Sequence, residues 1–154
     1  MRVLQLVHGY PPRERAGTEV YAARLADRLR ALGHDVHTLA ATQRPGAPMY
    51  GVEEEPGLTR VVQNAPYAGL RSGERDRAME QLVADRVARQ RPDLLLVQHL
   101  RGLSCHLPGD VPAAWMLHDA WAWCPAGGLL LRDGAPCSGP GPACPACASR
   151  WAKD

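Results

Sequence analysis

The residues best suited to chemistry are histidines that stand directly after short apolar runs. Three runs end in this way, at His8, at Gln98-His99 and at His118-Asp119. Imidazoles titrate near neutral pH, so these positions are candidates for catalysis or ligand binding. A single histidine at such a place is most simply a loop residue. The case for function therefore depends on the matching positions of all three.

A second group of candidates is a cluster of cysteines near the C-terminal end. Four of the five cysteines have the spacing Cys124-x12-Cys137-x6-Cys144-x2-Cys147, and Cys105 stands apart as a predicted buried thiol. A C-x-x-C pair lets both sulfurs reach one ion, and two further thiolates complete a tetrahedral site. Structural zinc is the first interpretation. An iron–sulfur cluster, or cysteines that are free or disulfide-bonded, are the alternatives.

The elements that must position these residues follow from the apolar patterns. Short apolar or alternating runs predict strands at 3–7, 36–41, 58–62, 94–97 and 113–117. Helical spacing predicts a helix from Thr18, as N-cap, to Gly33, as the residue after its end, a second over 74–89, and a short one within 100–107. Residues 42–57 are turn-rich and acidic, which favours a surface loop or an added hairpin.

Alternating strands and helices predict an α/β fold with an open parallel sheet and helices on both faces. Because the carboxyl ends of parallel strands share one edge, where ligands of open α/β sheets bind, the three histidines are expected to meet in one cleft. Gly17 precedes the first helix, whose N-terminal N–H groups would face an anion there. The loop is not G-x-G-x-x-G, so a dinucleotide site is disfavoured.

Length and composition place further bounds on function. The chain has 154 residues, 45% of them apolar and 22% charged, as expected of one soluble domain. A net charge of +2 is too small to indicate a nucleic-acid partner. No apolar run has the length of a signal-peptide core or a membrane span, which favours a cytoplasmic location. Peripheral membrane contact stays open, although no clearly amphipathic basic helix is present.

Several motifs together resemble family 4 retaining glycosyltransferases. The opening at 2–12, the Ala16-Gly17-Thr18-Glu19 loop and Leu-Gly-His-Asp-Val at 32–36 are similar to the start of that family, whose usual loop is Gly-Gly-x-Glu. Ala16 replaces the first of those glycines. Further motifs resemble a subgroup with a cysteine-rich insert, here residues 120–150: Leu117-His118-Asp119, Trp121, Cys124-Pro125, Gly127 and Cys137-x-Gly139-Pro140.

The resemblance implies a GT-B fold. Residues 1–154 would form its single Rossmann-like, acceptor-side N-terminal domain, ending in a Cys/Gly/Pro-rich loop stapled by metal. The C-terminal, donor-binding domain would be absent from this chain, which alone would be inactive or nearly so. The implied reaction is hexosyltransferase-like: a nucleotide sugar donates its sugar, with retention, to a sugar, lipid or small-molecule acceptor.

The resemblance also implies roles for individual residues. His118 would be the catalytic residue, hydrogen-bonding a hydroxyl of the transferred sugar or supporting developing charge. Gly17 would approach the donor, and Glu19 would hold the loop and the helix start. The substrate site as a whole would comprise Gly17, Thr18, Glu19, His8, His99 and Asp119.

Two other classes of function compete with the enzyme. A non-catalytic, zinc-stapled Rossmann-like binding module would use the cysteine loop as a recognition surface. A reading frame that continues into a second βαβ domain would favour the enzyme, and one that ends at Asp154 with no partner chain would favour the module. A nicotinamide-dependent oxidoreductase is disfavoured by the missing glycine motif.

Overall fold

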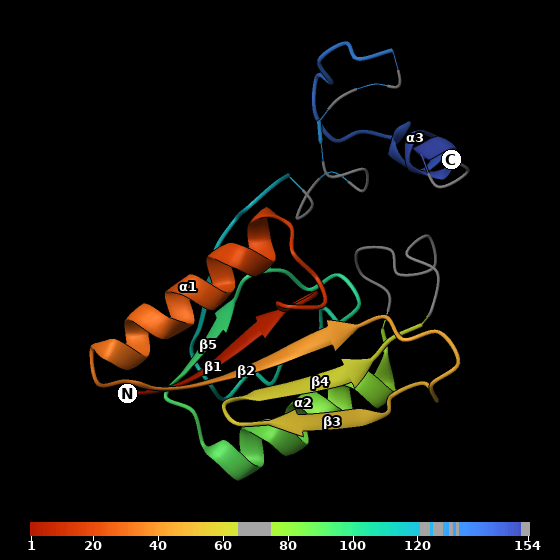
Figure 1. Ribbon diagram of the computed structural model, residues 1–154. Coiled ribbons are helices and arrows are strands. Elements are labelled where there is room, and N and C mark those ends of the chain that lie inside the picture. Colours follow the sequence, from red (N-terminus) through yellow and green to blue (C-terminus); the bar gives the residue numbers. More distant parts are fainter. Residues whose placement is uncertain (65–74, 121–123, 125–127, 130, 132, 152–154) are drawn as a thin grey trace.

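A computed structural model describes residues 1–64, 75–120, 124, 128–129, 131 and 133–151 (Figure 1). Its centre is a six-stranded sheet in the order β3-β4-β2-β1-β5-β6. The strands are Arg2–Val7 (β1), Asp35–Thr42 (β2), Val52–Glu55 (β3), Leu58–Val62 (β4), Leu94–Val97 (β5) and Ala113–Trp115 (β6). The helices of the described part are Gly17–Ala31 (α1), Arg77–Gln90 (α2) and Cys144–Trp151 (α3).

All neighbouring strands run parallel except β3, which pairs antiparallel with β4. The β3–β4 hairpin turns at Gly57, whose φ of 72° suits glycine, and it supplies the hairpin expected within 42–57. Because β1, β5 and β6 are parallel neighbours, their carboxyl ends lie along one edge of the sheet. The predicted α/β class is therefore confirmed, and the sheet predicted to be parallel is parallel except at β3.

The two faces of the sheet are covered by different helices (Figure 1). Val3 and Val7 of β1 cluster with Ala26 and Ala22 of α1 on one face. Their neighbours Leu4 and Leu6 point to the other face and cluster there with residues of α2. The alternation of side chains along a strand produces this division. The residues of α2 in the second cluster are Met79, Val83 and Val87.

The N-cap of the first helix lies two residues before the predicted one, Thr18, and the helix itself begins at Gly17. Ala16 is the N-cap residue, and the carboxylate of Glu19 accepts a hydrogen bond from its backbone N–H at 3.0 Å. Glu19 thus supplies the acidic half of a capping box, while alanine offers no side-chain acceptor for the other half. At the far end Gly33 adopts a φ of 84°, as predicted for the residue after the helix.

Three further expectations need correction. Residues 100–107 form turns instead of a short helix, because Gly102 adopts a φ of 74° that interrupts helical geometry. The last strand ends at Trp115 rather than at 117, although the Met116 N–H still bonds to the Val97 carbonyl. The cysteine-rich segment is not loop throughout, since it ends in α3, which starts at Cys144 and lies well away from the sheet (Figure 1).

Helix length also bears on membranes. Within the described ranges, no helix combines the length and the apolar character needed to cross a bilayer.

Candidate functional site

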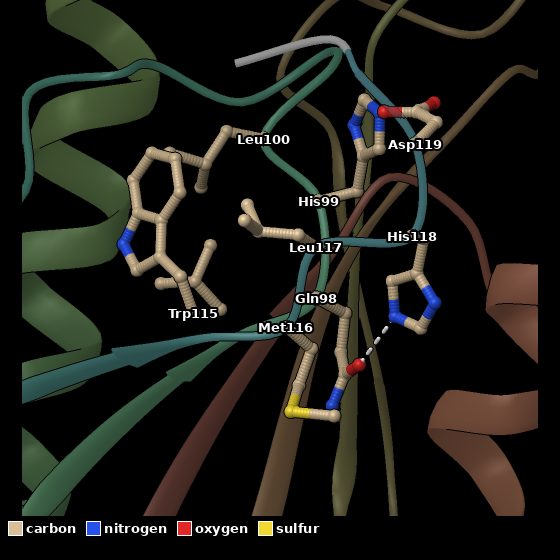
Figure 2. Close-up of a pocket in the computed structure, with 9 residues that line it drawn as sticks. Gln98, His99, Leu100, Trp115, Met116, Leu117, His118 and Asp119 are labelled. Atoms are coloured by element: carbon tan, nitrogen blue, oxygen red, sulfur yellow. Dashed lines mark hydrogen bonds and ion pairs between the residues drawn. The ribbon is translucent and has the colours of Figure 1, made fainter.

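The ends of β1, β5 and β6 bring the three predicted histidines to one edge of the sheet. The ring centroids of His8 and His99 are 4.4 Å apart, and their planes are tilted by 52°. His118 follows β6 and lies beside Gln98, as Figure 2 shows. A pocket is lined there by residues 97–100 and 115–119. The parallel strand order thus brings the three histidines to one edge, but of the three His99 and His118 line this pocket and His8 does not.

Glu19 links the start of α1 to His8. Its Oε1 lies 2.9 Å from His8 Nε2, and the Glu19 side chain is almost fully buried. Burial, followed by the charge of His99, lowers the pKa of His8 to about 4, and the opposing effect of Glu19 is smaller. Neutral His8 therefore donates from Nε2 to the Glu19 carboxylate. Its buried Nδ1 has no hydrogen-bond partner within the described part of the chain.

His99 is fixed by its own backbone and by the residue after His118. The Arg101 N–H donates to His99 Nδ1 at 3.0 Å, so this nitrogen carries a lone pair. His99 Nε2, which then carries the proton, lies 3.5 Å from an oxygen of Asp119. Burial lowers the pKa of His99, with Asp119 acting in the opposite direction. The ring is therefore neutral near neutral pH.

His118 is held between two elements of the fold. Its Nε2 lies 2.8 Å from the Oε1 of Gln98, which directly follows β5 (Figure 2). On another side the ring of Tyr21, from α1, meets it edge-on at 5.0 Å between centroids. The imidazole remains half-buried. It can therefore contact a ligand in the pocket while its orientation is set by the protein.

Gly17 and Thr18 are the first two residues of α1, next to this edge. A Cβ added to Gly17 would meet no atom within 4 Å, so the chain's own packing does not require a glycine there. The Thr18 hydroxyl forms no hydrogen bond within the described residues. Both positions are open to a ligand at the N-terminus of α1, where backbone N–H groups favour an anion.

The loop between β1 and α1 is held by Arg60, whose side chain is only 1% exposed. Its Nη1 and Nη2 donate to the carbonyls of Tyr10 and Pro11 at 2.9 and 2.8 Å, and its Nε donates to Glu55. Burying a guanidinium is costly unless it is fully hydrogen-bonded, so this network fixes the loop firmly. The loop carries His8 at one end and Gly17 at the other.

The four cysteines proposed as metal ligands supply suitable donors in an unsuitable arrangement. Cys124, Cys137, Cys144 and Cys147 are all partly buried and free. Backbone N–H groups of Gly139 and Gly141 point at two of the sulfurs, those of Cys137 and Cys144. Yet no three metal-binding side chains are gathered closely enough to hold an ion anywhere in the described ranges. The zinc site therefore stays a prediction from spacing alone.

Comparison with known protein families decides the broader classification. The model of Glycosyltransferase Family 4 matches residues 15–136, which is more than half of the chain. The chain belongs to glycosyltransferase family 4. Neither the curated proteins nor the solved structures contain a match.

The family 4 match covers α1, α2 and every strand of the sheet except β1, and it identifies this part of the chain as a glycosyltransferase-like N-terminal domain. The matched segment begins before α1 and includes His99 and His118. It ends one residue before Cys137, so three of the four clustered cysteines lie outside it. The match therefore bears on the cleft and not on the metal prediction.

The sequence interpretation missed three residues that shape the site. Gln5 and Arg60 are polar residues inside apolar strands, and Tyr21 lies on the exposed side of α1. A polar side chain within a buried run must find partners, so Gln5 and Arg60 carried a signal that could have been used. Tyr21 carried none, because its contact with His118 depends on the packing of α1.

Proposed function

We propose that this family 4 chain is the acceptor-side domain of a retaining GT-B glycosyltransferase. In this proposal it acts with a second, donor-binding domain to move a sugar from a nucleotide sugar to a sugar, lipid or small-molecule acceptor. The observation that carries the proposal is the half-buried His118 in a pocket at the carboxyl edge of the sheet, within the segment that matches the family.

The proposed role of His118 follows from its surroundings. Gln98 and Tyr21 hold its ring in place, so contact with a sugar hydroxyl costs little reorganisation. A group fixed in this way stabilises charge that develops on the sugar as the bond to the leaving phosphate breaks. The N-terminus of α1, at Gly17 and Thr18, faces the donor phosphates in this scheme.

The remaining cleft residues serve mainly to position these parts. The Glu19 carboxylate accepts hydrogen bonds from the Ala16 N–H, at the start of α1, and from His8. These two bonds keep the Glu19 carboxylate away from the pocket. Asp119 lies beside His99, and the neutral His99 ring adds no positive charge to the site. We assign His99 and Asp119, which line the pocket, to substrate binding, give His8 the role of holding Glu19 and the His99 ring in place, and leave the reacting centre to His118.

The test uses the complete protein that contains this chain. Isothermal titration with nucleotide sugars should give donor binding, and His118→Ala should lower kcat about 100-fold, because positioned acid–base or electrostatic groups contribute at that scale. His34→Ala is the matched control, since His34 lies beyond α1, beside the N-terminal amine. Absence of donor binding at millimolar concentration, with His118→Ala turning over as fast as the parent, would exclude the proposal. A non-catalytic binding module would then be the better description.

A further inference from the structure

A row of hydrogen-bonded polar side chains crosses the sheet and ends at His118. Gln5 Nε2 donates to the Ala22 carbonyl and to Thr38 Oγ1, both at 3.2 Å. Gln98 Nε2 donates to Gln5 Oε1 at 3.1 Å, and Gln98 Oε1 lies 2.8 Å from His118 Nε2. The row thus connects α1, β2, β1 and the segments after β5 and β6.

The direction of this row is fixed at its far end. The Ala22 carbonyl can only accept a hydrogen bond, so Gln5 must turn its amide nitrogen toward α1 and its oxygen toward Gln98. That oxygen can also only accept, so Gln98 must offer its nitrogen to Gln5. Gln98 therefore presents its oxygen to His118, and the imidazole must carry its proton on Nε2.

Burial makes this direction hard to reverse. Gln5 and Thr38 are 0% exposed and Gln98 is 2% exposed, so water cannot replace a lost partner. Turning either amide over would place two acceptors or two donors against each other in a low-dielectric interior. Such buried mismatches are costly, and a fully satisfied row of this kind holds one arrangement.

The other two imidazoles leave His118 as the acceptor that the cleft offers. His99 Nδ1 already accepts the Arg101 N–H, and His8 Nδ1 is buried from solvent. His118 Nδ1 lies on the side of its ring away from Gln98 (Figure 2) and makes no hydrogen bond within the described part of the chain. A lone pair at this position accepts a proton from a donor such as a hydroxyl.

We infer that Gln5 and Gln98 are positioning residues that hold His118 as its Nε2–H tautomer, so that Nδ1 accepts a hydrogen bond from a hydroxyl of the bound ligand. The ligand group at this point is then a neutral hydroxyl and not a phosphate oxygen, which is itself an acceptor. This inference rests on the proposed function for the identity of the ligand as a sugar. The tautomer itself is a property of the unliganded chain.

The first test is the nitrogen-15 spectrum of the histidine rings in the unliganded chain. The spectrum is recorded at a pH about two units above the ordinary histidine pKa, so that the rings are neutral. The two neutral tautomers differ in which ring nitrogen has the chemical shift of a protonated atom, and His118→Gln assigns the signals. We expect His118 to be protonated on Nε2. A ring protonated mainly on Nδ1 would overturn the inference without any substitution.

The second test changes a residue that does not touch His118. Gln5→Met removes the group that orients Gln98, so the Nδ1–H tautomer of His118 should appear in the spectrum. Thr38→Val is the matched control: it removes a partner of Gln5, but the Ala22 carbonyl still fixes the amide, so the spectrum of His118 should be unchanged. If Gln5→Met has the parent's spectrum, the row does not set the tautomer.

Kinetics of the complete protein separate this inference from the proposed function. Gln5→Met should lower kcat/KM about tenfold, the effect of one hydrogen bond, and Thr38→Val should not. If the tautomer is as expected but His118→Ala leaves turnover intact, the proposed function fails and the positioning role stands. If His118→Ala abolishes turnover but the tautomer is Nδ1–H, the positioning role fails and the function stands.

Discussion

The rings of His8 and His99 lie 4.4 Å apart, centroid to centroid, at the carboxyl edge of the sheet. Each is mostly buried, so a positive charge on one would be placed in a poorly solvated site beside the other. This closeness explains why burial and the neighbouring imidazole together lower the pKa of His8 to about 4. It also makes the stability of the cleft dependent on pH.

We expect folding stability to fall as the pH is lowered from about 6.5 to about 4. In this window the unfolded chain takes up a proton on His8 that the folded chain does not accept, so protonation favours unfolding. His8 accounts for on the order of 3 kcal/mol of this loss. The free energy of unfolding, measured by urea denaturation at a series of pH values, should fall less steeply with decreasing pH for His8→Gln than for the parent. An equal dependence of this free energy on pH in the two proteins would contradict the attribution of the effect to His8.

The N-terminus of α1 offers a test of which residue caps it. Glu19→Ala leaves the Ala16 N–H and His8 Nε2 without their acceptor, so the free energy of unfolding should fall by about 2 kcal/mol. Thr18→Ala should change it by less than about 0.5 kcal/mol, because Thr18 is not the cap. Urea denaturation of both variants is the measurement. A larger loss for Thr18→Ala than for Glu19→Ala would restore Thr18 as the N-cap.

Arg60 should resist even a conservative substitution. Lysine has one ammonium group and cannot reach the Tyr10 carbonyl, the Pro11 carbonyl and Glu55 together, so Arg60→Lys should cost about 2–4 kcal/mol. Arg2→Lys is the control, because Arg2 pairs with Asp93 on the surface and should change stability by less than about 1 kcal/mol. Unfolding midpoints compare the two. Similar midpoint shifts would mean that the buried fork is dispensable.

The cysteine cluster makes a prediction that does not depend on the cleft. Protein purified without added metal should contain about one zinc ion per chain, lost in Cys144→Ser and Cys147→Ser and kept in Cys105→Ala. Since no three of these sulfurs are close enough to share an ion in the described part of the chain, binding would require the four cysteines to move together. Elemental analysis together with the colour of the sample is the measurement. A brown sample rich in iron indicates an iron–sulfur cluster, and a colourless sample without metal refutes both the zinc site and the iron–sulfur cluster.

The sheet and its cleft were largely predictable from the sequence. Apolar runs identified β1 and β5, and the parallel-strand rule placed His8, His99 and His118 at one edge. The start of α1 was misplaced because Thr18 has the more typical capping side chain. The actual cap depends on Glu19 reaching back to a residue with no polar side chain.

Contacts between distant residues lay beyond sequence reasoning. Gln98 was expected at the cleft, but its partner Gln5 is 93 positions away along the chain, and no local pattern connects them. The turn at Gly102 shows a similar limit. Leu100 and Leu103 have helical spacing and are both buried, yet the chain between them forms a turn, with the Leu103 N–H bonded to the Leu100 carbonyl.

The buried amide of Gln5 also affects the register in which the strands pair. Its neighbours Leu4 and Leu6 point to the opposite face of β1. If β1 slid by one residue against β2 and β5, a leucine would meet Thr38 and Gln98, while the amide would be forced among aliphatic side chains. Such a slip would leave several buried polar groups without hydrogen-bond partners. The row therefore favours one strand alignment, and its hydrogen bonds form together only when five separate parts of the chain have reached their final places.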